Sequence, residues 1–244
     1  MMRLFLSLLL SGLFILALPA CATGYPSEYA AEAIEAWVID AETKQPLEGV
    51  IVVAHWELEG GIHLGVMGDL EVLETVTDKN GRFHFPAWGP KKLPRGLPHN
   101  ARLTANDPEL LLFKGGYKFD MLSNPGTMAA LKGQGGPVRR SQWNRKTIEL
   151  SPFKVTAYRP KYEDNFESFN GELERIAARD PKACGWKKIP NTIRAMNLER
   201  RRMVEQGVNP NTLSTIDNRL ITNDDYFTKQ GGCGSPKEFF GGFQ

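Results

Sequence analysis

The sequence lacks the features that indicate several common classes of protein. Its 30 Lys and Arg residues almost balance 28 Asp and Glu residues, so the formal net charge is only +2. A chain without a strong net charge has no global field that attracts nucleic acid or an anionic membrane, and we expect no nucleic-acid partner. Internal repeats and low-complexity tracts are also absent.

Motifs of catalysis and metal binding are equally scarce. The chain has no G-x-S-x-G for a serine nucleophile, and no helix is expected after the glycine-rich stretch at 133–136. Its four histidines are His55, His63, His84 and His99, and none of them has a spacing typical of metal ligands. We therefore predict no catalytic residue, no metal ligand and no cofactor.

The longest apolar run, residues 4–18, is shorter than the roughly 20 residues that span a membrane. It follows Arg3 and ends in small residues before Cys21, an order that is typical of an export signal. With Leu18, Ala20 and Cys21 the segment resembles the signal of a bacterial lipoprotein. In that family the cysteine carries lipid and becomes the mature N-terminus.

This resemblance implies a membrane-bound protein with a lipid anchor at Cys21 and a signal peptide over residues 1–21. Ala22 stands where such proteins carry an Asp when they are retained at the inner membrane. We therefore expect the outer membrane, facing the periplasm, and a tether over residues 22–33. Two alternatives stay open: ordinary signal cleavage after Ala22, and an uncleaved membrane anchor.

Export would also reduce the number of cysteines available for a disulfide from three to two. Without Cys21, the mature chain holds Cys184 and Cys233, and these two can pair outside the cytoplasm. The bond would close a loop of about 50 residues, worth about 4 kcal/mol in the chain-entropy model. The alternative is two free, buried thiols.

Short β-rich segments separated by turns dominate the first part of the chain. The pattern predicts strands at 34–40, 47–56, 70–77, 101–105, 110–113 and 146–150. The stretches 60–68, 86–98 and 122–142 are rich in Gly and Pro and are expected to be loops. The turn 78–81 predicts a hairpin whose following strand buries Phe83 and Phe85. Strands without intervening helices indicate an antiparallel β-sandwich.

The order of these motifs resembles that of the carboxypeptidase regulatory-like domain. The matching segments are 37–40, the Pro-Leu-x-Gly turn within 44–50, the T-D-x-x-G-x-F-x-F stretch at 77–85, and Gly116-Tyr117. The resemblance covers about residues 34–151. It implies a transthyretin-like β-sandwich with no enzymatic activity of its own.

Two enzyme families with a related sandwich are disfavoured by the sequence. Transthyretin-like hydrolases of the urate pathway end in Tyr-Arg-Gly-Ser, whereas this chain ends in Phe-Phe-Gly-Gly-Phe-Gln. Intradiol dioxygenases hold iron with two Tyr and two His. Tyr117, Tyr158 and Tyr162 are available here, but the histidine spacing of that family is missing.

The last part of the chain, residues 152–244, has a helical pattern. We predict helices at 172–179 and 191–206, and a third at 211–220. Helices this short are not stable alone, so we expect them to dock on the sandwich. The predicted fold is thus mainly β: a transthyretin-like antiparallel β-sandwich over 34–151 with a small C-terminal α-helical appendage.

Two groups of side chains are candidates for binding a partner. Trp88 and Trp143 stand beside Gly- and Pro-rich loops, where exposed rings would stack on sugars and buried rings would cover the sandwich. Arg200, Arg201 and Arg202 form a basic run that would suit anionic lipid. The alternative for the arginines is a solvated helix face with internal ion pairs.

These observations favour a non-enzymatic envelope lipoprotein whose sandwich and loops bind a protein or glycan partner. An alternative is a periplasmic hydrolase or carbohydrate-active accessory enzyme with a site between the sandwich and the tail. A third hypothesis is a component of a surface secretion or assembly machine. A concave pocket with converging carboxylates and a His would favour the enzyme, and scattered polar groups would favour the binding module.

Overall fold

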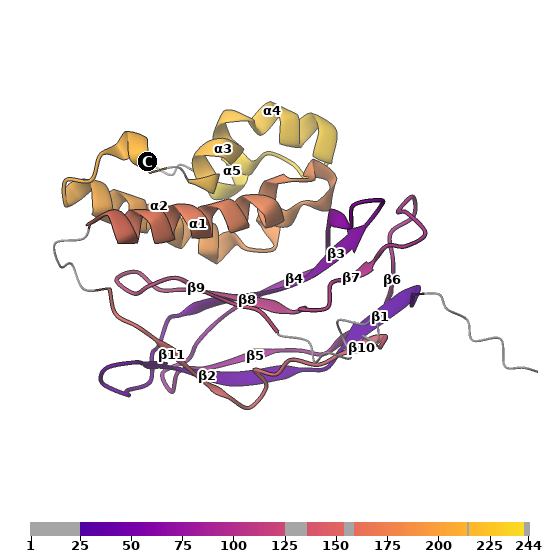
Figure 1. Cartoon of the computed structure of the whole chain (residues 1–244). Helices are drawn as coiled ribbons and strands as arrows, with labels where there is room; N and C mark the ends of the chain where they lie inside the picture. Colours follow the sequence, from indigo (N-terminus) through magenta and orange to yellow (C-terminus); the bar gives the residue numbers. More distant parts are fainter. Residues whose placement is uncertain (1–24, 125–135, 154–158, 214, 242–244) are drawn as a thin grey trace, which may run out of the picture.

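The computed structural model describes residues 25–124, 136–153, 159–213 and 215–241. Strands form the first part of the chain and helices the last (Figure 1). The strands are β1 Glu28–Ala31, β2 Ile34–Asp40, β3 Ile51–Gly60, β4 Gly65–Val76, β5 Arg82–Phe85, β6 Trp88–Lys92, β7 Arg102–Leu103, β8 Glu109–Phe113, β9 Asp120–Leu122, β10 Val138–Arg139 and β11 Thr147–Leu150. The α-helices are α1 Arg159–Ala178, α2 Pro190–Glu205, α3 Ile216–Thr222, α4 Asp224–Tyr226 and α5 Pro236–Phe240.

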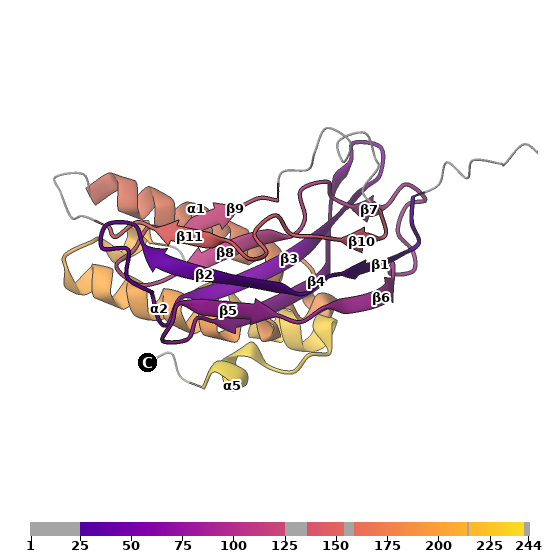
Figure 2. The same cartoon turned by 90° about the horizontal axis from the view of Figure 1, so that it is seen from below.

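The strands build a β-sandwich, as the sequence predicted. One layer is a five-stranded sheet in the order β4-β3-β8-β9, with β7 paired to the far end of β3. The facing layer consists of two three-stranded sheets, β11-β2-β5 and β10-β1-β6, laid end to end (Figures 1 and 2). Most pairs are antiparallel, but β11 runs parallel to β2 and β10 runs parallel to β1.

The sandwich core follows from the alternation of side chains along the strands. Residues of both layers that point inward are apolar and buried, and they include Trp56, Phe83 and Leu112. Phe83 and Phe85 are 2% and 1% exposed, which confirms the predicted inward face of β5.

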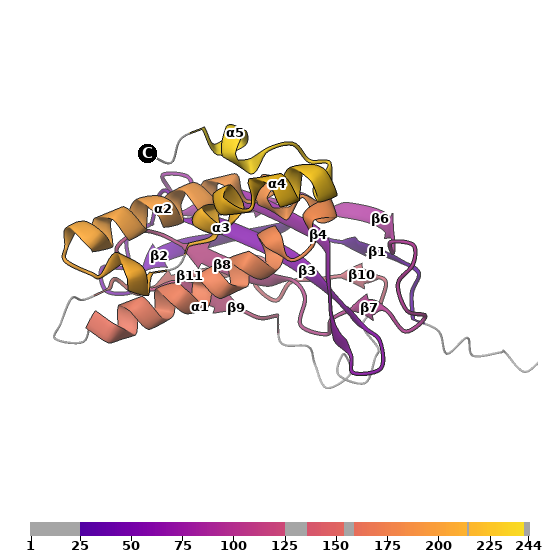
Figure 3. The same cartoon turned by 90° about the horizontal axis from the view of Figure 1, so that it is seen from above.

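A third layer of helices covers the outer face of the five-stranded sheet (Figures 1 and 3). Phe166, Phe169 and Leu173 of α1 lie in one apolar cluster with Leu111 and Phe113 of β8. The central sheet is therefore buried on both faces, and the predicted docking of the C-terminal helices is confirmed.

A disulfide joins Cys184 to Cys233, as the cysteine arithmetic predicted. The two Cα atoms lie 5.8 Å apart, and the sequence separation is 49 residues. The bond ties the segment that follows α1 to the segment that precedes α5, so it braces the helical layer.

Three segments expected to be irregular hold short strands. The predicted tether at 22–33 contains β1, in which Tyr29 is buried. The loop at 86–98 contains β6, and the insertion at 122–142 contains β10. These strands pair with one another, so they depend on contacts between distant segments rather than on local propensity. The first helix is also longer than predicted, starting at Arg159 instead of 172.

The prediction of a hairpin around the turn at 78–81 was right about the turn and wrong about the pairing of the two strands that flank it. The turn forms, with Gly81 N donating to Asp78 O at 2.8 Å. However, β4 pairs with β3 while β5 pairs with β2, so the turn carries the chain from one sheet to the other. Gly81 has a φ of +70° and packs so closely on Val38 O that a Cβ would collide with it.

Among the described residues, no helix combines the length and apolar character needed to cross a membrane. The predicted signal peptide, Cys21 and the start of the tether lie outside the described residues.

Candidate functional site

The two faces of β3 differ in chemistry. The residues that face the sandwich core are all apolar: Val52, Ala54, Trp56 and Leu58. On the other face, Val53 packs beneath the helices, but the next three positions are His55, Glu57 and Glu59. The helix-facing side of the central sheet therefore turns from apolar to polar along a single strand.

A cavity of about 530 Å³ lies over this polar part of β3. Its walls come from β1, β3, β7, β8, β9 and β10, from the residues between β7 and β8, and from α1. It lies at the end of the sandwich where β1, β7 and β10 meet (Figure 1). Its volume lies within the range of small-molecule binding sites.

His55 is the centre of the polar network, with a side chain that is only 2% exposed. It donates from Nδ1 to Asp69 Oδ1 at 2.9 Å and from Nε2 to Glu109 Oε2 at 3.2 Å. Burial alone lowers the pKa of His55, but the two hydrogen bonds and the two negative charges outweigh it and raise the pKa to about 10. The ring is therefore an imidazolium held between two carboxylates.

A second network links the sheet to α1. Arg175 forms ion pairs with Glu57 on β3 and with Glu172 one turn before it, the latter at 3.1 Å from Nη1 to Oε2. The second oxygen of Glu172, Oε1, is buried and has no hydrogen-bond partner among the described residues. Burial raises the pKa of both glutamates, although Arg175 opposes the shift.

Asp107 is the most deeply buried carboxylate of the pocket. Its side chain is 1% exposed, and it lies 3.4 Å from Arg139 Nε. Neither of its oxygens accepts a hydrogen bond from another described residue. Burial raises the pKa of Asp107 to about 7, because desolvation outweighs the charge of Arg139. The arginine itself donates from Nη2 to Leu103 O at 3.2 Å.

Tyr25 and Arg102 form the rim of the cavity. The guanidinium of Arg102 lies 4.5 Å from the centre of the Tyr25 ring, and its Nη2 lies 2.7 Å from Glu59 Oε1. Tyr25 is 41% exposed, so its ring offers an accessible aromatic surface beside the polar walls.

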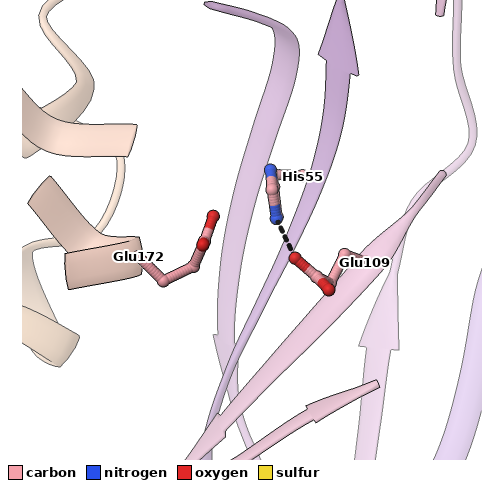
Figure 4. Close-up of side chains that lie close together, drawn as sticks. All are labelled: His55, Glu109 and Glu172. Carbon is pink, nitrogen blue, oxygen red and sulfur yellow. Dashed lines mark hydrogen bonds and ion pairs between the residues drawn. The ribbon is translucent and has the colours of Figure 1, made fainter. Parts of the chain in front are cut away.

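Three of these side chains point toward one another (Figure 4). They are His55 from β3, Glu109 from β8 and Glu172 from α1, and one ligand atom of each lies within 4.8 Å of the others. The sequence predicted no metal ligand, and that prediction stays untested, although the fold brings His55 together with two carboxylates. Polar residues at alternate positions 55, 57 and 59 could have predicted that one face of this strand is polar. No pattern within α1 could have predicted that Glu172 lies against that face.

The two candidate tryptophans are half-buried and pack on the sandwich core. Trp88 meets Trp56 edge-on, with ring centres 5.2 Å apart. Trp143 donates from Nε1 to Ser123 O at 3.1 Å. Both rings therefore cover the sandwich, which is the alternative to exposed rings that stack on sugars.

The candidate arginines lie on α2, and none of them lines the pocket. Arg200 donates to the carbonyls of Leu213 and Pro210, at 3.1 and 3.2 Å. Arg202 forms an ion pair with Glu199, and Arg201 between them is half-buried. These contacts match a helix face with internal partners.

The tyrosines considered for an iron site do not gather in the described part of the chain. Tyr117 donates from its hydroxyl to Asp40 Oδ2 at 2.8 Å, at the end of the sandwich where β2 finishes. Tyr158 and the side chain of Tyr162 lie outside the described part. His63, His84 and His99 are exposed.

No protein-family model and no curated protein matches the chain. Among solved structures, it is similar to the pilus 2b backbone protein of group B streptococcus, with 16% identity over 50% of this chain and 41% of that one and a TM-score of 0.23. It is also similar to 3-chlorocatechol 1,2-dioxygenase from Rhodococcus opacus 1CP, with 17% identity over 53% of this chain and 62% of that one and a TM-score of 0.27. The chain thus spans less than two thirds of either protein, and similarity this low carries no argument about function.

Proposed function

We propose that this protein is a non-enzymatic envelope lipoprotein that binds a glycan in the pocket between its β-sandwich and its helical layer. The sandwich is proposed to be a carboxypeptidase regulatory-like domain, on the motifs given above. The observation that carries the proposal is the cavity of about 530 Å³, lined chiefly by polar and charged side chains.

The composition of the walls favours a hydroxyl-rich ligand without a large charge. Sugar hydroxyls both donate and accept hydrogen bonds, so they suit walls that offer carboxylate acceptors and guanidinium donors side by side. The two kinds of charge are nearly balanced. The acidic wall residues are Glu57, Glu59, Asp107, Glu109 and Glu172, and the basic ones are His55, Arg102, Arg139 and Arg175.

The rim adds an apolar contact to these hydrogen bonds. A sugar ring has one face of C–H groups, and such a face would pack against the side of the Tyr25 ring opposite Arg102. Small-molecule sites commonly combine aromatic surface with a few well-placed polar groups.

The proposed attachment to a membrane is supported by the β3–β4 hairpin, whose tip projects beyond the sheet (Figure 3). Four apolar side chains are exposed there: Ile62 at 96%, Leu64 at 46%, Met67 at 39% and Val66 at 37%. Residues 60–68 contain no Asp, Glu, Lys or Arg. Exposed apolar surface without charge suits the headgroup boundary of a bilayer.

A binding screen tests the proposal directly. Soluble neutral oligosaccharides and muropeptides would be titrated by calorimetry into the disulfide-bonded protein, with and without Tyr25→Ala. We expect a ligand that binds the wild type and loses about 10-fold in affinity with the variant, from the lost ring contact. Tyr226→Ala is the matched control, since Tyr226 is 49% exposed and does not line the pocket. Equal losses in both variants, or no ligand in the whole panel, would count against the proposal.

A concave pocket in which His55 converges with carboxylates is the arrangement that the sequence analysis named as favouring an enzyme, so a periplasmic hydrolase acting on the same class of ligand is an equal second candidate. Paired carboxylates are the usual machinery of glycosidic hydrolysis. The two functions separate in one assay. Prolonged incubation of the bound oligosaccharide, followed by product analysis, would leave it intact for a binding module. New reducing ends that disappear with Glu109→Gln would establish the enzyme instead.

A further inference from the structure

His55, Glu109 and Glu172 are residue types that bind metal ions, and all three line the pocket. Each residue comes from a different element, namely β3, β8 and α1, so the cluster exists only in the folded chain. In Figure 4 the glutamate from the helix and the glutamate from the strand approach the ring from two sides.

We propose that His55, Glu109 and Glu172 bind one divalent transition-metal ion of the Zn²⁺ or Mn²⁺ class. The ligand atoms would be Nε2 of the imidazole and one oxygen of each carboxylate. The remaining coordination positions would face the cavity, where water or a ligand hydroxyl would complete the shell. This goes beyond glycan binding and does not depend on it.

The distances fit such an ion after a small contraction. An ion about 2.1 Å from each donor needs donor atoms roughly 3–3.5 Å apart. Nε2 of His55 and Oε2 of Glu109 are already 3.2 Å apart, and all three ligand atoms lie within 4.8 Å of one another. The carboxylate of Glu172 would have to move further than that of Glu109 to reach the ion. Its Oε1 is free to do so because it forms no hydrogen bond with a described residue.

The other ring nitrogen of His55 is oriented as in metal sites. Nδ1 donates to Asp69 Oδ1 at 2.9 Å, and Asp69 is 12% exposed at its side chain. A carboxylate behind the ring fixes the tautomer and makes Nε2 a better ligand. The ion would take the place of the proton that Nε2 now shares with Glu109.

The charge around the cluster also favours a cation. Arg175 is the positive group next to Glu172, and it forms an ion pair with Glu57. Asp107, whose oxygens accept no hydrogen bond from another described residue, lines the same cavity. Arg139 faces Asp107 and is held by it. Arg139 is thus paired outside the ligand set, and Arg175 has Glu57 as a second partner that would retain it when Glu172 turns to an ion.

One imidazole with two carboxylates indicates the class of metal. Zn²⁺ and Mn²⁺ accept mixed nitrogen and oxygen ligands. Ca²⁺ takes six to eight oxygen ligands, and imidazole is not among them. Calcium is therefore the natural negative control.

Calorimetric titration of the disulfide-bonded protein, dialysed against EDTA and then into metal-free buffer, tests the inference. ZnCl₂ and MnCl₂ are the probes, and CaCl₂ is the control. We expect one Zn²⁺ or Mn²⁺ per chain, and an affinity at least about 10-fold weaker for Glu172→Gln and for Glu109→Gln. Glu59→Gln removes the same charge from the same pocket without touching a proposed ligand, and it should bind like the wild type.

Circular dichroism would establish that all three variants are folded. Two results would overturn the inference: no binding of either metal at millimolar concentration, or binding that survives both Glu172→Gln and Glu109→Gln, as expected for ions on the exposed histidines. This test is independent of the proposed function, because glycan binding can be measured in EDTA, where the metal site would be empty.

Discussion

The two faces of strand β3 differ: one builds the sandwich core, and the other lines the cavity. Toward the sandwich, apolar side chains continue to the end of the strand, from Val52 to Leu58. Toward the helices, the apolar face stops at Val53, and His55 and Glu57 follow it. Adjacent residues on the same strand thus have opposite environments because side chains alternate across a sheet.

The polar face has a high energetic cost that the apolar face does not have. Burying a carboxylate oxygen without a hydrogen bond is unfavourable, and among the described residues both oxygens of Asp107 and one oxygen of Glu172 are in that position. By contrast, Asp40 at the opposite end of the sandwich accepts hydrogen bonds from two backbone amides and from Tyr117. Buried polar atoms without hydrogen-bond partners at one cavity mark it as a candidate site for a ligand or an ion.

The largest loss of stability is expected from a substitution on the apolar face of the sheet. Leu112→Ala removes a fully buried side chain from the sandwich core and should lower the free energy of unfolding by roughly 2–5 kcal/mol. Urea denaturation measures this loss. Metal and glycan affinities of the folded variant should equal those of the wild type, because Leu112 does not line the pocket. A large change in affinity would mean that the two faces are not independent.

The next effect concerns pH. Because burial raises the pKa of Asp107 to about 7, the folded chain binds this proton more tightly than the unfolded chain. Its contribution to stability is fully present below about pH 4 and is lost as the pH rises through about 7. Relative to Asp107→Asn, the wild type should lose stability by at most a few kcal/mol over this window, in metal-free buffer. Parallel stability curves would contradict this assignment.

On the polar face, the effects on binding should exceed those on stability. Glu57→Gln weakens a partly exposed ion pair with Arg175 and should change stability by no more than about 1 kcal/mol. The same change should weaken glycan binding about 10-fold through a lost charged hydrogen bond. Glu149→Gln, which breaks an exposed pair with Lys44 away from the pocket, should leave affinity unchanged. If both variants bind alike, Glu57 does not contact the ligand.

The smallest effect on stability is expected at the hairpin tip. Ile62→Glu changes a side chain that is 96% exposed and should alter stability by less than about 0.5 kcal/mol. In a lipid-free Cys21→Ser background, it should abolish sedimentation with phosphatidylethanolamine and phosphatidylglycerol vesicles, because a charge opposes burial at the headgroup boundary. Leu198→Glu, on α2 with 64% exposure, is the control. Unchanged sedimentation of the Ile62 variant would remove the hairpin from the membrane contact.

Much of the fold was predictable because it depends on local patterns. Alternating apolar residues located β2 at 34–40, and the Asp-x-Asn-Gly turn located the start of β5. Cysteine arithmetic predicted the pair Cys184–Cys233. In each case neighbouring residues carry the information, through side-chain periodicity or turn geometry.

The rest depends on contacts between distant segments. Strands β1, β6 and β10 have weak local propensity and form by pairing with one another. The pocket joins Glu172 to His55, 117 positions earlier in the sequence, and no short motif spans that separation. The alternation that places His55 and Glu57 on one face was readable, but its meaning required knowing that helices cover the same face.

Hydrogen–deuterium exchange of the disulfide-bonded protein, with and without an oligosaccharide found in the binding screen, tests most directly whether the polar end of the helix-facing side of β3 is the proposed binding site. We predict that the ligand slows exchange in peptides covering residues 102–109 and 172–175, which contain lining residues of the cavity such as Arg102, Asp107 and Glu172. Peptides around Asp40 and Tyr117, at the other end of the sandwich, should be unaffected. Protection at that other end, with none around the cavity, would contradict the account.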